Sequence, residues 1–162
     1  MKKILLILVT AILFTMCGTG KKATAEAKAE ASTRPEVQYK DDFRSVTDAE
    51  KAAFLKKMKA TAANTSILIF TKTYKGEKVV ASANGKNIFT GYLMSNNKTG
   101  IADKIRISNT VDTKIYDSFT KKEVIIDAAE AQKHKFIYLM KDTSGKQNPF
   151  VITYSNTLRP LE

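Results

Sequence analysis

The stretch Ser66-Ile67-Leu68-Ile69-Phe70-Thr71-Lys72-Thr73-Tyr74 is rich in β-branched and aromatic residues, which favour β-strands. Its first half is apolar at successive positions, so both faces of a strand formed there would be apolar. That pattern is typical of a central strand with a covering layer on each side. We therefore expect a strand over residues 66–74 inside a two-layer domain.

The residues after this stretch repeat the strand pattern, with turn-forming residues in between. Lys75-Gly76 predicts a turn. Asn84-Gly85 predicts a tight hairpin between strands over residues 77–83 and 86–94, because a type I′ turn needs positive φ at both central residues. Further strands are expected over residues 101–107, 113–119, 121–127, 135–141 and 150–154. About seven or eight short strands predict a mainly β fold, an antiparallel β-sandwich of the immunoglobulin- or transthyretin-like kind.

One amphipathic helix is expected before the strands. Thr47-Asp48-Ala49-Glu50 fits a capping box, in which the Thr47 hydroxyl accepts from the backbone and Glu50 reaches back to it. The helix should run over residues 48–63, with an apolar stripe made by Phe54, Leu55, Met58 and Ala62. We favour packing of this stripe on the sheet. The alternative is a helix lying on an anionic membrane, with positive charges supplied by Lys56, Lys57 and Lys59.

The N-terminus has the layout of a bacterial export signal. Lys2 and Lys3 precede an apolar run over residues 4–16, which ends at the single cysteine, Cys17, and small residues follow. The run is shorter than the about 20 apolar residues that cross a bilayer as a helix. A signal peptide over residues 1–16 that is removed is therefore favoured over a permanent membrane span.

The residues Leu13-Phe14-Thr15-Met16-Cys17 resemble the lipobox of bacterial lipoproteins. The resemblance implies that the Cys17 thiol receives a diacylglycerol group and that the chain is cut just before it. Met16 stands where the motif usually has a small residue. Two alternatives are open: ordinary cleavage after Gly20 or Ala25, which would give a secreted soluble protein, and an uncleaved anchor.

The residues that follow Cys17 in the sequence are expected to form a tether and a folded domain. Residues 21–31 are alanine, lysine, glutamate and threonine only, so they contain no large apolar side chain to bury. We expect residues 17–44 to form a flexible tether and residues 45–162 to form one folded domain. The predicted location is the bacterial cell envelope, with the domain lipid-anchored to a membrane and facing the periplasm or the exterior.

The chain is strongly basic. It carries 27 Lys and Arg against 16 Asp and Glu, a net charge of +11. Outside the cytoplasm, a basic protein meets anionic lipid headgroups and envelope polysaccharides rather than nucleic acid. The lysines are scattered along the sequence, which also fits a solubilising surface.

The sequence offers no recognisable catalytic set. His134 is the single histidine, and one histidine with one cysteine inside the leader cannot supply a tetrahedral zinc site. The aspartates are dispersed and lack the spacing of a calcium-binding loop. We therefore predict a protein that is not an enzyme and uses no cofactor or metal. A small secreted enzyme with an unrecognised site is the alternative.

Tyrosines suggest a binding surface. Five of them lie in or at the ends of expected strands and are mixed with lysines: Tyr74, Tyr92, Tyr116, Tyr138 and Tyr154. The first four are the candidates for the binding surface. Such rings can stack on a sugar or pair with a cation, or they can simply cover sheet edges. The predicted function is a non-enzymatic envelope lipoprotein that contacts protein or polysaccharide. The alternative is a binder of envelope glycan or anionic lipid that uses these tyrosines with Lys56, Lys57 and Lys59.

Overall fold

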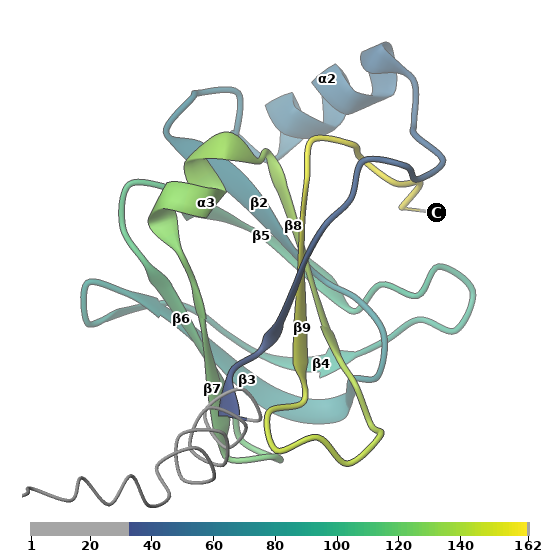
Figure 1. Ribbon diagram of the computed structural model, residues 1–162. Helices are drawn as coiled ribbons and strands as arrows, with labels where there is room; N and C mark the ends of the chain where they lie inside the picture. The colour runs from purple at the N-terminus through teal and green to yellow at the C-terminus, as the bar shows by residue number, and fades with distance from the viewer. Residues whose placement is uncertain (1–32, 162) are drawn as a thin grey trace, which may run out of the picture. The chain divides into compact units, whose positions relative to one another are not determined.

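Two β-sheets enclose a shared core in the computed structural model, which describes residues 33–161 (Figure 1). The five-stranded sheet contains, in spatial order, β1 (Glu36–Tyr39), β9 (Phe150–Ser155), β8 (Phe136–Lys141), β2 (Thr65–Phe70) and β5 (Asp103–Ser108). The four-stranded sheet contains β4 (Lys86–Met94), β3 (Lys75–Ala83), β6 (Thr113–Asp117) and β7 (Lys122–Ile126). The helices are α2 (Asp48–Lys57) and α3 (Ala128–Lys133). The prediction of a mainly β domain is confirmed.

Strand β2 lies inside the five-stranded sheet, between β8 and β5. Leu68 and Phe70 face the core shared with the four-stranded sheet, whereas Ile67 and Ile69 face a second cluster on the opposite side. Both faces of β2 are therefore covered, as its continuous apolar sequence predicts. The strand ends at Phe70, before the predicted end at residue 74, because the chain turns at Thr73, whose φ is 76°.

The five-stranded sheet is mixed, which corrects the expectation of an antiparallel sandwich. Strand β2 pairs with β8 in parallel, and β1 pairs with β9 in parallel. Parallel partners need a long connection, and β2 and β8 are separated by five strands and a helix along the chain. Their apolar runs are both buried on two faces, a property of parallel strands that is visible in the sequence.

The predicted hairpin at Asn84 and Gly85 is confirmed. Both residues have positive φ, 49° and 72°, as a type I′ turn requires. The turn joins β3 to β4, and Ala83 pairs directly with Lys86 across it. Strand β4 occupies residues 86–94, the predicted range.

Helix α2 begins with the capping box that the sequence predicts. The Thr47 amide donates to the Glu50 carboxylate at 2.8 Å, and the Glu50 amide donates to the Thr47 hydroxyl at 3.3 Å. The helix ends at Lys57, earlier than the predicted residue 63. Lys59 then has a φ of 52°, which ends the helical path and leads the chain toward β2.

The apolar side of α2 packs on the five-stranded sheet. Phe54, Leu55 and Met58 contact the cluster that contains Ile67 and Phe136. This contact is the packing that we favoured from the sequence, and it partly covers the side chains that a membrane-surface helix would need to insert.

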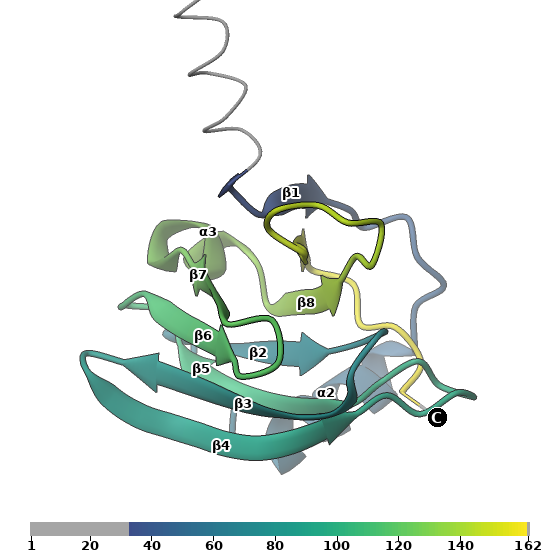
Figure 2. The same ribbon diagram turned by 90° about the horizontal axis from the view of Figure 1, so that it is seen from below.

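The folded domain begins earlier than predicted. Glu36–Tyr39, expected in the tether over residues 17–44, form β1 at the edge beside β9 (Figure 2). Asp41 strengthens this attachment, because its carboxylate accepts from the Ser155 hydroxyl at 2.8 Å and from the Asn156 amide at 2.6 Å. The short alternation of Val37 and Tyr39 is the local signal for this strand. Residues 17–32 of the predicted tether lie outside the described residues.

Candidate functional site

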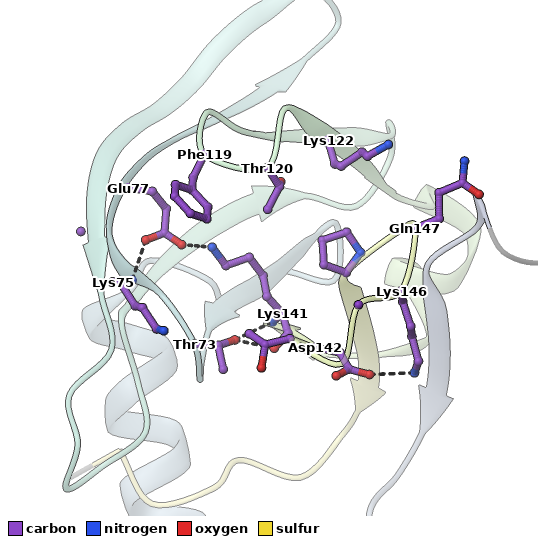
Figure 3. A pocket seen from close by; sticks show the side chains of 14 residues that line it. Thr73, Lys75, Glu77, Phe119, Thr120, Lys122, Lys141, Asp142, Lys146 and Gln147 are labelled. Atoms are coloured by element: carbon purple, nitrogen blue, oxygen red, sulfur yellow. Dashed lines mark hydrogen bonds and ion pairs between the residues drawn. The ribbon is translucent and has the colours of Figure 1, made fainter.

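A pocket of about 610 Å³ opens at the end of the domain where β3 begins and β8 ends (Figure 3). Its walls come from the first residues of β3, from the turn between β6 and β7, and from the loop over residues 142–149 between β8 and β9. This turn and loop lie together at the bottom of Figure 1. We call this cavity the end pocket.

A buried lysine forms the base of the end pocket. Lys141, the last residue of β8, is 5% exposed, and its ammonium donates to the Asp117 carboxylate at 2.8 Å. The same ammonium pairs with Glu77, whose side chain is 7% exposed. Lys141 belongs to the five-stranded sheet, whereas Glu77 and Asp117 belong to the four-stranded sheet. This ion-pair cluster of Lys141, Glu77 and Asp117 therefore joins the two sheets at the pocket.

Asp117 also fixes the turn that forms one wall. Its second carboxylate oxygen accepts from the Phe119 amide at 2.8 Å and from the Thr120 amide at 3.1 Å. Lys121 follows with a φ of 57°, which brings the chain into β7. The turn holds the Phe119 ring at 79% exposure, and Figure 3 shows it beside Glu77 and above Lys141. A large apolar ring is thus presented to solvent by a well-bonded turn.

The start of β3 forms the wall next to this turn. The Lys75 amide donates to the Glu77 carboxylate, so Glu77 is bonded at both of its oxygens. Gly76 lies between them with a φ of 101°, a conformation that other residues rarely adopt. The Lys141 amide donates to the Thr73 hydroxyl at 3.2 Å, which fixes the preceding turn to β8.

The loop between β8 and β9 is braced by a second ion-pair group. Lys146 donates to Glu36 at 2.6 Å and to Asp142 at 2.8 Å. The bonds from Lys146 and from the Ser144 amide lower the pKa of Asp142 to about 2. These pairs are more exposed than those of Lys141, and they tie β1 to the pocket loop.

Burial affects the protonation of the Lys141 ammonium at the bottom of the pocket. Burial, with a smaller effect from the charge of Lys75, lowers the pKa of Lys141 to about 8. The two bonded carboxylates favour its ammonium form, so Lys141 is protonated at neutral pH. The Lys141 ammonium lies 4.8 Å from the centre of the Tyr74 ring, a cation–π distance.

The residues predicted for a joint tyrosine and lysine surface do not form one surface. Tyr74 and Tyr138 are core residues. Tyr92 and Tyr116 lie on the outer face of the four-stranded sheet, opposite Lys78 and Val80 of β3. The three predicted lysines lie on and just after α2, on the far side of the five-stranded sheet: Lys56, Lys57 and Lys59. Cys17 lies outside the described residues.

The burial of two tyrosines has specific causes. Tyr138 lies in β8, which is covered on both faces, and its hydroxyl donates to the Thr157 carbonyl at 2.9 Å. The Arg159 guanidinium stacks on its ring, with 4.2 Å to the ring centre. Tyr74 packs edge-on against Phe70 in the shared core. Strand alternation alone does not indicate that the second face of a strand is also covered.

Alkaline titration should reveal these buried phenols. Burial raises the pKa of Tyr154 to about 12 and raises the pKa values of Tyr74 and Tyr138. Unfolded tyrosine ionises near pH 10. Between about pH 10 and pH 12 the unfolded chain therefore binds fewer protons, and the stability that these phenols contribute is lost as the pH rises.

The measurement is the ultraviolet absorbance of tyrosinate during a pH titration with and without urea. We expect a class of tyrosines that ionises late only in the folded protein and that becomes smaller in Tyr154→Phe. Identical ionisation of all six tyrosines in the two conditions would contradict the burial.

Sequence reasoning missed the residues that build the end pocket. Lys141, Glu77 and Phe119 each resemble ordinary strand-end or turn residues, and Asp117 resembles one dispersed carboxylate among several. The available signal was a lysine that directly ends the apolar run of residues 136–140. The single histidine, His134, lies elsewhere, with its ring 5.4 Å from the Tyr154 ring and its Nδ1 bonded to the Glu130 carbonyl.

None of the helices within residues 33–161 is long and apolar enough to cross a membrane. The same range contains no group of three or more histidine, cysteine, aspartate or glutamate side chains that could hold a metal ion. No protein-family model matches the chain, and no curated protein matches it.

Proposed function

We propose that this protein is an exported, lipid-anchored binding domain of the bacterial cell envelope and that the end pocket is its ligand site. The end pocket is the observation that carries the proposal. Its volume of about 610 Å³ falls within the about 300–1,000 Å³ of small-molecule sites. It combines an exposed aromatic ring with charged groups whose positions are fixed by hydrogen bonds. Pockets with fixed polar groups and apolar walls are the usual binding sites of small domains.

A binding role is supported over an enzymatic one by the state of the acidic groups. Asp117 accepts from Lys141, Phe119 and Thr120, and Glu77 accepts from Lys141 and Lys75. A general base must lie within reach of the proton that it removes. Both carboxylates are instead held against the Lys141 ammonium and against backbone amides of the pocket walls, so we assign them a role in shaping the pocket.

The fold supports the same kind of role. We propose that the domain is a variant of the immunoglobulin- or transthyretin-like sandwiches. Two sheets that share one core support this grouping, and the parallel pairing of β2 with β8 is a departure from the antiparallel sheets of that class. Loops at the end of such a sandwich are frequent positions for binding residues.

The proposed anchor is tested by Cys17→Ser in the native host. Without the thiol no thioether can form, so we expect most of the protein to move from the membrane pellet to the soluble fraction. Two acyl chains give stable attachment, and their loss removes the main membrane affinity. The measurement is immunoblotting of the fractions together with mass spectrometry of the mature amino terminus.

Thr19→Ser is the matched control, because it changes a nearby small residue and keeps the thiol. It should leave the protein in the pellet, with an acylated cysteine as the first residue. A Cys17→Ser protein that stays in the pellet, or a wild-type amino terminus without acyl groups, would refute the anchor. Binding at the end pocket is tested separately by the ligand series that follows.

A further inference from the structure

We propose that the end pocket binds a small organic anion with an apolar body, such as an aryl or alkyl carboxylate or phosphate. This inference rests on the proposed function, since it names the ligand class of the same site. Two features of the pocket carry it: lysines that have no acidic partner among the described residues, and an aromatic ring that is held in solvent.

The charges around the pocket balance in total, with four lysines against four carboxylates, but the charges that have no ion-pair partner among residues 33–161 are positive. Lys141 and Lys146 are each paired with two carboxylates, which also occupies the acidic groups of the pocket. Lys75 and Lys122 line the same pocket, and neither has a carboxylate within ion-pair distance among residues 33–161. The Lys75 and Lys122 ammonium groups are therefore available to an entering anion. An entering cation would have to compete with Lys141 and Lys146 for their carboxylate partners.

The apolar part of the ligand has a matching surface. Phe119 is one of the most exposed large apolar residues of the described chain, and its ring centre lies 5.9 Å from the Lys141 ammonium. This contact turns the ring toward the base of the pocket, as Figure 3 shows. Pro149 and the Thr120 side chain add to the wall. A ligand body placed against this ring would remove apolar surface from water on both partners.

The pocket is already arranged for such a ligand. The Phe119 turn is held by Asp117, and the β8–β9 loop is held by Lys146, so two of its walls need little ordering on binding. Preorganised walls reduce the entropy cost of binding. The flexible Lys75 and Lys122 side chains can then adjust to the position of the anionic group.

The test is a ligand series with one constant body and a varied charge. The probes are 4-phenylbutyrate, 4-phenylbutyl phosphate, 4-phenylbutanol and 4-phenylbutylamine, with acetate as an anion that lacks the body. Binding is followed by the amide chemical shifts of the full chain, which also locate the site. We expect both anions to bind at the Phe119 and Thr120 amides about five- to tenfold more tightly than the alcohol, and the amine to bind most weakly. Carboxylate and phosphate arms show which head group is preferred.

Paired lysine variants test the charge argument. Lys75→Gln with Lys122→Gln should abolish the preference for the anions and leave binding of the alcohol unchanged. Lys56→Gln with Lys57→Gln removes the same charge on α2 and should keep the preference. The preference should also shrink at about 0.5 M salt, because exposed charges are screened. Phe119→Ala should weaken every phenylbutyl ligand.

The outcomes separate the two proposals. Equal binding of anion, alcohol and amine at the pocket would overturn the ligand class and leave the pocket as a binding site. Loss of anion preference in the Lys56 and Lys57 variant would overturn the assignment to Lys75 and Lys122. No shift at the pocket with any probe, while the protein stays folded, would overturn both the ligand class and the proposed function.

Discussion

Lys141→Met should lower the free energy of unfolding by about 3–5 kcal/mol, because it leaves Asp117 and Glu77 as buried carboxylates without their cation. Methionine keeps most of the length and volume of lysine, so the cavity term is small and the lost charge dominates. The expected measurement is a urea unfolding curve followed by circular dichroism, since the chain contains no tryptophan to report by fluorescence.

Lys146→Met is the matched control. It removes the same ammonium from the same pocket, but Lys146 and its partners Glu36 and Asp142 are more exposed. Exposed ion pairs contribute about 0–1 kcal/mol, so the control should be nearly as stable as the wild type. A similar decrease in the free energy of unfolding for both variants would contradict the argument that burial makes the Lys141 pairs more important for stability than the exposed Lys146 pairs.

A triple variant separates charge from packing. Lys141→Met combined with Asp117→Asn and Glu77→Gln removes all three charges, and the side-chain amide oxygen introduced at position 117 can still accept from the Phe119 amide. Neutral replacement of a whole buried ion-pair group is often tolerated. The triple variant should therefore recover much of the stability that the single variant loses. A further large loss would contradict the charge argument, because neutralising the two carboxylates would then fail to relieve the destabilisation that Lys141→Met causes.

The strands of this domain are determined by local sequence, whereas their pairing is not. Asn84-Gly85 specifies its own hairpin, because the positive φ values depend on those two residues. The pairing of β2 with β8 depends on residues about 70 positions apart, and no local pattern distinguishes a parallel from an antiparallel partner. The apolar runs of the two strands indicated burial on both faces, but not which strand would lie beside which.

The end pocket is harder to predict for the same reason. Lys141, Asp117 and Glu77 come from three strands of two sheets, and each by itself resembles a solvated residue at a strand end. Their pairing appears only after the sheets pack. The prediction for the tyrosines had the opposite error, because it placed buried residues on the surface. Their polar hydroxyls made Tyr74 and Tyr138 fit exposed strand positions, whereas both rings are in the core.

Phe70→Ala should lower the free energy of unfolding by about 3–5 kcal/mol, the usual range for truncating a buried phenylalanine. Phe70 is fully buried and packs against two other rings, with 5.8 Å between its ring centre and those of Tyr74 and Phe89. Its ring faces the core shared by the two sheets, so the lost volume lies between them. Neighbouring strands cannot move in freely to fill that volume. Urea unfolding gives the value directly.

Phe119→Ala makes the same truncation on the exposed ring of the end pocket. Because that ring is 79% exposed, its removal should change the free energy of unfolding by no more than about 0.5 kcal/mol. The two variants thus divide the phenylalanines by role: Phe70 holds the sheets together, and Phe119 is available to a ligand. A loss of several kcal/mol in Phe119→Ala would show that the ring belongs to the core of the fold, and the binding role assigned to it would then fail.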